Sequence, residues 1–193
     1  MIMWKRKLYR IGMGLIFPLT YIFTKTVFWP LLITTFFLTL LGALEYERWK
    51  NPNVWKWLLE RAGGIFKTHP GKLTGDTCFM LSVFLLLLFF PKEITIASLF
   101  FLIFGDAGSG IIGSKFGRIK IFPGKTIEGF IGGFVFNLIV SFFLLTFLNL
   151  PFYILLSGVL ISSIFEILPL KIDDNLTVGL SSGIVMWILK LTG

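Results

Sequence analysis

Long runs of apolar residues, separated by short polar or glycine-containing stretches, dominate the sequence. Seven runs can be marked, at residues 11–24, 27–44, 77–91, 94–112, 127–148, 151–168 and 176–189. A helix needs roughly 20 apolar residues to cross a bilayer, and several runs approach that length. The pattern therefore predicts an all-α fold, a polytopic transmembrane helical bundle of about seven spans.

The first run is short for a span, and it contains Gly12, Gly14 and Pro18. A tilted, re-entrant or interfacial segment would fit this run as well as a span does. The basic residues before it give the N-terminus the look of a signal peptide, but no small-residue cleavage site follows. We therefore interpret the run as an uncleaved first span.

The longest connection, residues 45–76, lies between the second and third runs and is amphiphilic. Its three tryptophans stand among lysines and arginines, as Trp49, Trp55 and Trp57. This mixture is typical of a helix at the membrane surface, so we expect an interfacial amphipathic segment here. Asn51-Pro52 marks a break within it.

Composition agrees with a membrane protein, since 55% of the 193 residues are apolar and only 15% are charged. Soluble domains average about 25% charged residues. The length fits one integral membrane domain, residues 1–193, with no separate soluble domain. The net charge of +8 does not indicate a nucleic-acid partner, because the basic residues flank apolar runs instead of forming a continuous stripe.

The distribution of basic residues predicts the orientation in the membrane. With seven spans, 15 of the 18 lysines and arginines fall on one side, which the positive-inside rule assigns to the cytoplasm. The N-terminus is then cytoplasmic. Nine of the ten acidic residues also lie at or near this face, Glu93 being the exception. Acids beside many cations can hold a metal and a polyphosphate together, so we expect an active site there.

Asp106 is the only charged residue in the run 94–112. A carboxylate near the centre of a membrane helix costs on the order of 2.5–3.5 kcal/mol, and less toward the helix end. Helix packing explains the glycines around it, among them Gly105 and Gly108, because small residues let membrane helices approach closely. It does not explain the carboxylate. We therefore interpret Asp106 as functional, with glycines that also bring backbone close to a ligand.

The stretch Gly124-Lys125-Thr126-Ile127-Glu128-Gly129 stands at the start of the fifth run. Thr126 can cap the helix that follows, and a helix N-terminus attracts anions. Lys125 would then contact a phosphate, and Glu128 would orient Lys125 or bind a metal. An ordinary capping box does not explain Glu128, which follows Thr126 by two residues instead of three.

A third acidic group lies near the last two runs, with Glu166 in an otherwise apolar run and Asp173-Asp174-Asn175 before the final one. Capping of the final helix explains one of these residues but not the set. Hard oxygen ligands suit Mg²⁺ that bridges nucleotide phosphates. The predicted metal ligands are Asp106, Glu128, Glu166 and Asp174.

The stretch Lys72-Leu73-Thr74-Gly75-Asp76 opens the third run. A helix cap by Thr74 or Asp76 explains it as well as a ligand-binding role does. No P-loop, kinase catalytic loop or nucleophile elbow occurs in the sequence.

In this order the groups resemble the polyprenol kinase family, which comprises dolichol kinases, phytol kinases and CTP-dependent diacylglycerol kinases. The resemblance spans roughly residues 45–180. The residues that carry it are Leu73-Thr74-Gly75, Gly105-Asp106-Ala107, Gly113, Phe116-Gly117, Lys125-Thr126-Ile127-Glu128-Gly129, Glu166 and Asp174-Asn175-Leu176. It implies a Mg²⁺-dependent enzyme that transfers the γ-phosphoryl group of CTP to the hydroxyl of a lipid alcohol, polyprenol-like or diacylglycerol.

On this interpretation Asp106, Lys125, Glu128 and Asp174 are catalytic. The nucleotide-binding residues would be Lys72, Thr74, Gly75, Gly105, Gly108, Lys125, Thr126 and Asn175. Either Asp106 or Asp76 would serve as the base for the lipid hydroxyl. The enzyme would lie in a cell inner membrane, or in the endoplasmic reticulum of a eukaryote.

Two other functions compete with this one. Residues 122–133 look very similar to the phosphatidate cytidylyltransferases, whose C-terminal signature, a Lys-Asp followed by a His-Gly-Gly and Asp-Arg run, is absent here. Buried acids in membrane helices also mark ion or proton pathways. A transporter, however, is expected to place such charges at mid-bilayer and not at one face.

Overall fold

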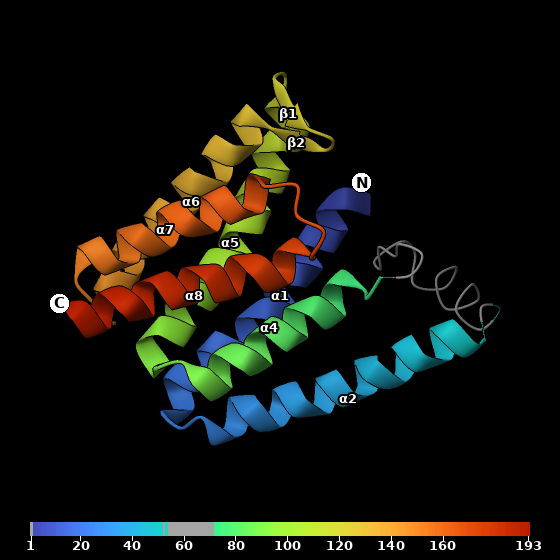
Figure 1. Cartoon of the computed structure of the whole chain (residues 1–193), viewed down its shortest axis with the longest axis horizontal. Coiled ribbons are helices and arrows are strands. Elements are labelled where there is room, and N and C mark those ends of the chain that lie inside the picture. The colour runs from blue at the N-terminus through green and yellow to red at the C-terminus, as the bar shows by residue number, and fades with distance from the viewer. Residues whose placement is uncertain (1, 52, 54–71) are drawn as a thin grey trace.

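The structure is a computed structural model that describes residues 2–51, 53 and 72–193 (Figure 1). This part of the chain contains seven helices: α1 (Ile2–Thr24), α2 (Phe28–Lys50), α4 (Gly75–Phe89), α5 (Lys92–Phe116), α6 (Ile127–Leu145), α7 (Phe152–Ile167) and α8 (Asp174–Thr192). Four of them, α2, α5, α6 and α8, are long and apolar enough to cross a membrane, and α4 and α7 are shorter apolar helices. The predicted all-α membrane bundle is confirmed.

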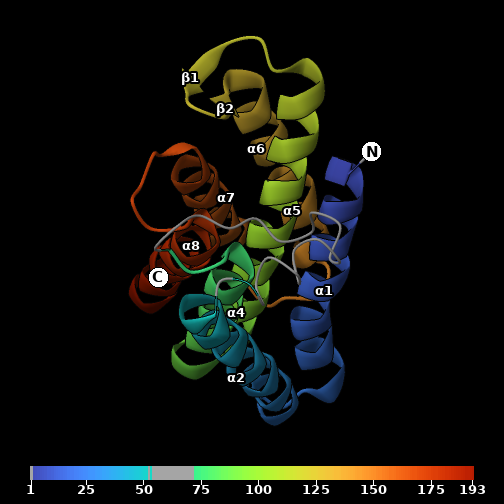
Figure 2. The same ribbon diagram turned by 90° about the vertical axis from the view of Figure 1, so that its right-hand side faces the viewer.

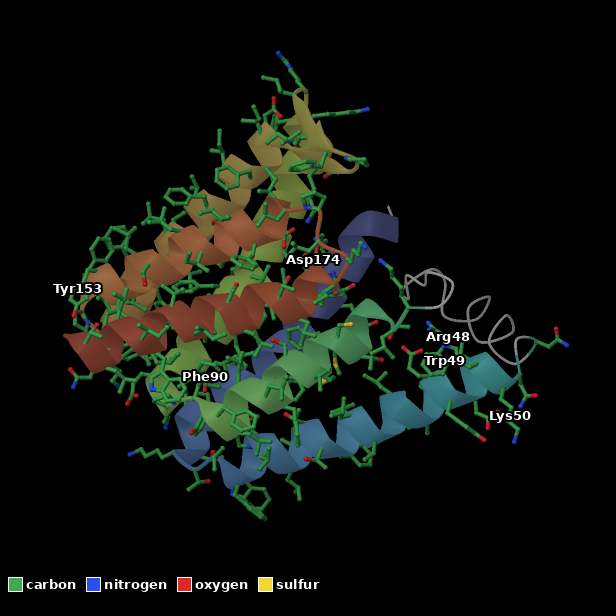
Figure 3. The ribbon with its side chains drawn as sticks, in the orientation of Figure 1. Arg48, Trp49, Lys50, Phe90, Tyr153 and Asp174 are labelled. Carbon is green, nitrogen blue, oxygen red and sulfur yellow. The ribbon has the colours of Figure 1, made fainter. Side chains whose placement is uncertain are left out.

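Successive helices run in opposite directions (Figure 1). The starts of α1, α4, α6 and α8 therefore lie at the same end of the bundle as the ends of α2, α5 and α7, and we call this the polar end. Figure 3 shows Asp174 at this end and Phe90 and Tyr153 at the opposite one. At that opposite end Lys190 pairs with Glu93 at 3.1 Å.

Helix α5 is the centre of the bundle, since it packs against α1, α4, α6, α7 and α8 (Figure 2). Its residues from Ile94 to Ile103 are all buried. Helix α2, by contrast, packs mainly on α4 and α1 at the edge. It exposes Phe28, Leu32 and Phe36, which are spaced by four residues and so share one face. We interpret that face as lipid-facing.

Glycines allow α5 and α6 to approach closely. A Cβ atom on Gly108 would lie 2.8 Å from the carbonyl oxygen of Gly132 and 2.7 Å from the ring of Phe136. A Cβ on Gly105 would lie 2.7 Å from the amide of Asn137. Gly105 and Gly108 therefore serve the helix packing that small residues make possible in membranes.

Two helix boundaries differ from the apolar runs. Helix α1 begins at Ile2 instead of residue 11, and α2 continues to Lys50 instead of ending at residue 44. Both helices continue past their apolar stretch into polar residues. In α2 the charges of Glu45 and Arg48 in this extension neutralise each other, since the two side chains pair at 2.9 Å. Helix α2 then stops at Asn51, which confirms the predicted break. Most of the predicted interfacial segment, with Trp55 and Trp57, lies outside the described residues.

A short hairpin joins α5 to α6, and the apolar runs did not predict it. Strand β1 (Lys120–Phe122) pairs in antiparallel fashion with β2 (Lys125–Thr126). Pro123 and Gly124 form the turn, and the φ of +78° at Gly124 is one that glycine adopts without strain. Thr126 then caps α6 by accepting a hydrogen bond from the Gly129 amide at 3.1 Å, as predicted. The hairpin thereby carries Lys125 to the polar end.

The packing of α5 on α6 can be tested by the substitution Gly108→Ala. The added methyl would overlap backbone, so we expect a loss of about 1–3 kcal/mol in the free energy of unfolding. Gly42→Ala on α2 is the matched control, because a Cβ there meets nothing within 4 Å. This control should be neutral or stabilising by up to about 1 kcal/mol. Thermal unfolding in detergent micelles measures both, and equal effects would contradict the assignment.

Candidate active site

Asp106 of α5 is held by two cations from α1. The Nζ of Lys7 donates to Oδ1 at 2.7 Å, and Nη1 of Arg10 donates to Oδ2 at 3.3 Å. Lys7 also donates to the Asp106 carbonyl oxygen at 2.7 Å. The Lys7 side chain lies directly against Gly110, one turn further along α5, where any larger residue would displace it. The costly carboxylate is thus paired on both oxygens.

Lys125 of the hairpin joins the last two helices in the same way. Its Nζ donates to Glu166 of α7 at 2.6 Å and to Asp174 of α8 at 3.0 Å. Burial lowers the pKa of Lys125, but the two carboxylates outweigh this and raise it above its ordinary value. The ammonium therefore keeps its charge at physiological pH.

Polar side chains link these two groups of charges. Ser109 Oγ lies 3.3 Å from the Glu166 carboxylate and 3.2 Å from the Asp106 carbonyl oxygen. Arg10 Nη2 donates to the side-chain oxygen of Asn175 at 3.1 Å. Asp173, which caps α8, in turn accepts from the Asn175 amide at 3.0 Å. We call the linked set the ion cluster: Lys7, Arg10, Asp106, Lys125, Glu166, Asp174 and Asn175.

Five residues proposed from the sequence thus come together in the ion cluster: Asp106, Lys125, Glu166, Asp174 and Asn175. Gly75, at the start of α4, borders it. A Cβ on Gly75 would lie 3.0 Å from Nη2 of Arg10 and 3.1 Å from Nδ2 of Asn175, so the absence of a side chain gives these groups room.

The remaining proposed residues have other contacts. Both oxygens of Glu128 accept from the Ile119 amide at 3.3 Å, which ties the start of α6 to the hairpin connection. Lys72 is exposed and donates to the Lys171 carbonyl oxygen at 3.3 Å. Thr74 caps α4, as Thr126 caps α6. Their roles toward a nucleotide or metal, like those of Gly105 and Gly108, stay predictions.

Lys7 and Arg10 were missed, because the sequence analysis treated them only as charges that set topology. Their spacing of three residues held the signal, since it places both on one face of a helix.

A second buried group was also missed. Glu45 pairs with Arg48 and accepts from the Thr74 amide at 2.6 Å, and Arg48 donates to the Lys72 carbonyl oxygen. This group fixes the start of α4 beside the ion cluster.

A cavity of about 190 Å³ lies between α1, α2, α4 and α5 and reaches the ion cluster. Its walls are mostly apolar and include Met13, Phe37, Leu41, Phe79 and Leu102. One part is polar and is lined by Tyr9, Arg10, Asp76, Asp106 and Asn175. A ligand with an apolar tail and a polar head matches this arrangement.

The residues of the ion cluster fit Mg²⁺ only together with a nucleotide. Among the described residues no three acidic, histidine or cysteine side chains converge on one metal position. Mg²⁺ that carries nucleotide phosphates needs just one or two protein carboxylates, however. Glu166 and Asp174, which meet at Lys125, would hold it, and the ion would neutralise phosphate charge.

Comparison with known proteins indicates the family of this chain. A family model described as the cytidylyltransferase family matches residues 67–170, more than half of the chain. The chain belongs to the cytidylyltransferase family. The match includes Asp106, Lys125 and Glu166, and membership indicates an enzyme that uses CTP. Together with the apolar helices it points to a CTP-using enzyme of membrane lipids.

Two known proteins are similar to this chain in sequence. An uncharacterised protein of Rickettsia prowazekii (strain Madrid E) is 30% identical over 186 residues, which cover 92% of this chain and 89% of that protein. A phosphatidate cytidylyltransferase of Staphylococcus haemolyticus (strain JCSC1435) is 44% identical over 66 residues, which cover 31% of this chain and 25% of that protein. No solved structure matches significantly. The match supports a CTP-using lipid enzyme, and the resemblance to the polyprenol kinases stays a prediction.

The pairing of Lys125 with Glu166 predicts a specific pattern of stabilities. Lys125→Met would leave a buried carboxylate without its closest cation, a change that costs about 3–5 kcal/mol when both partners are fully buried. Because Lys125 is 30% exposed, we expect a smaller loss, about 1–3 kcal/mol. Adding Glu166→Gln should recover most of it. Lys120→Met, on the exposed strand of the same hairpin, is the control for thermal unfolding in micelles, and a double variant no better than the single one would contradict the pairing.

Proposed function

We propose that this family member is a membrane lipid kinase that transfers the γ-phosphoryl group of CTP to the hydroxyl of a lipid alcohol. One observation carries the proposal: the apolar-walled cavity ends at the ion cluster. A lipid in the cavity would place its hydroxyl beside residues suited to a triphosphate. The polar end would face the cytoplasm, where CTP is available.

The lipid chain would lie between α1, α2 and α4, with Phe37, Leu41 and Phe79 among its contacts. Helix α2 is the outermost helix on this side and packs mainly on α4 and α1 (Figure 2). A lipid could therefore enter sideways from the bilayer, and its chain would stay in apolar surroundings throughout. Only the head group would meet the charged residues.

In the transfer step the lipid oxygen forms a bond to the γ-phosphorus, and the bond from that phosphorus to the β–γ bridging oxygen breaks. CDP leaves with the bonding electrons, and the hydroxyl proton passes to a carboxylate. Asp76 and Asp106 both line the polar part of the cavity, and either would take this proton. Lys125 would neutralise the β- and γ-phosphates, since such transfer depends on positioning and electrostatics.

The C-terminal segment favours γ-transfer over cytidylyl transfer. The family match ends at residue 170, before Asp173-Asp174-Asn175-Leu176. Asp174 and Asn175, which this later segment contributes to the ion cluster, are the residues that resemble the polyprenol kinases. A hydroxyl acceptor also needs a base, and the cavity supplies a carboxylate at its polar part.

The second candidate is a phosphatidate cytidylyltransferase. The family match and the Staphylococcus relative support this candidate as well as they support the kinase. In that reaction a phosphate oxygen of phosphatidate bonds to the α-phosphorus of CTP, and pyrophosphate leaves. The same cavity and the same ion cluster would serve both reactions.

Labelled CTP separates the two reactions. Purified protein with Mg²⁺ is incubated with a panel of lipid alcohols and phosphatidate, and with CTP labelled at the α- or the γ-phosphate. We expect label in the lipid from the γ-position only, and a fall of at least about 100-fold for Asp106→Asn and Asp174→Asn. Glu93→Gln, at the opposite end of the bundle, is the control. Label from the α-position only would overturn the kinase proposal in favour of its rival.

Filling the cavity tests where the lipid lies. Leu41→Trp adds bulk inside it, so the KM for the lipid should rise about tenfold or more while the KM for CTP stays within about twofold. Leu32→Trp makes the same change on the exposed face of the same helix and should alter neither. Steady-state kinetics in mixed micelles give both constants. An unchanged lipid KM in Leu41→Trp would place the lipid elsewhere.

A further inference from the structure

We infer that Arg10 binds the phosphate attached to the lipid, where the cavity meets the ion cluster. The inference rests on the proposed function and deepens it, since it names the group that holds the phosphate on the lipid side. That phosphate would be the one just transferred to a lipid alcohol. In the cytidylyltransferase alternative it would be the phosphate of phosphatidate, and the chemistry that Arg10 recognises is the same.

Arg10 is the only cation among the residues that line the cavity as the structure describes it. Its side chain is 26% exposed and also belongs to the ion cluster through Asp106 and Asn175. A head group at the polar part of the cavity would therefore meet the guanidinium directly. Lys7 does not line the cavity, because it lies buried against α5.

The contacts of Arg10 leave it able to take up a phosphate. Its two side-chain bonds, to Asp106 and Asn175, measure 3.3 and 3.1 Å. Charge-assisted N–H···O⁻ bonds are usually about 2.7–2.9 Å long, so the bond to Asp106 is weak. A guanidinium has five donors in a planar fork that matches two phosphate oxygens at once.

Arg10 can turn toward a phosphate while Asp106 stays paired. Lys7 binds the other oxygen of Asp106 at 2.7 Å and would still neutralise it. Lys125 is held more closely, at 2.6 Å from Glu166, on the far side of Ser109. Arg10 lines the cavity and Lys125 does not, so we assign Arg10 to the lipid phosphate and Lys125 to the nucleotide, with Lys7 as the residue that positions Asp106.

Direct binding tests this division without relying on turnover. Two lipid pairs differ only by a phosphate: dioleoylglycerol with dioleoyl phosphatidate, and farnesol with farnesyl phosphate. We expect the full-length protein to bind the phosphorylated member of one pair more tightly. Arg10→Gln should weaken that binding by about 10- to 100-fold and leave the alcohol and CTP within about twofold. Arg10→Lys should retain part of the preference, because a charge remains without the fork.

Lys190→Gln is the matched control, since it removes another cation paired with a carboxylate, at the opposite end of the bundle. CTP binding reports whether each variant is folded, and Arg10→Lys serves if Arg10→Gln does not fold. No preference for phosphate in the wild-type protein, or an unchanged preference in Arg10→Gln, overturns the inference. The labelled-CTP experiment is separate. Transfer from the α-position with loss of preference in Arg10→Gln would refute the kinase and uphold the role of Arg10.

Discussion

The pairing of Asp106 with the cations of α1 is the constraint on which this structure depends. A carboxylate on the central helix of a membrane bundle is expensive unless cations neutralise it. Lys7 and Arg10 do so on both oxygens, and they thereby bind α1 to α5 at the polar end. Because α1 also forms one wall of the cavity, the interaction that neutralises Asp106 also shapes the place for a lipid.

The other charges extend the same principle to the rest of the bundle. Lys125 joins the hairpin to α7 and α8, and Arg10 reaches from α1 to α8. Glycines on α5 and α6 let their backbones come close, and the hairpin that joins them lies at one edge of the bundle (Figure 2). Apolar packing thus holds the helices in the bilayer, while ion pairs align their ends. On the proposed function, the ion pairs of Lys125 are also the groups that a charged nucleotide would engage.

The residues of the ion cluster come partly from inside the family match and partly from the segments on either side of it. Residues 67–170 supply Asp106, Lys125 and Glu166, while the segments before and after supply Lys7, Arg10, Asp174 and Asn175. On the proposed function, a shared central block would bind CTP in enzymes whose terminal segments differ. Which phosphorus is attacked would then depend on what α1 and α8 bring to the acceptor side. This arrangement is why the two candidate reactions compete so closely.

Apolar run length alone predicted the helices, because a bilayer demands long apolar stretches with satisfied backbones. Asp106 and Glu166 stood out in the sequence for a related reason, since charge is rare in such stretches and needs a partner. Asp174 stood out because capping of the last helix does not explain the whole set Asp173-Asp174-Asn175. What the sequence left open was which partner each would find. Lys7 and Arg10 lie about 100 residues from Asp106, and Glu128, which looked equivalent to Glu166, bonds instead to the neighbouring Ile119 amide. Only the packing of α1 on α5, and the placement of the hairpin within reach of α7 and α8, selected those contacts. Ion pairing depends on distance in space, and a linear pattern of residues does not contain that distance.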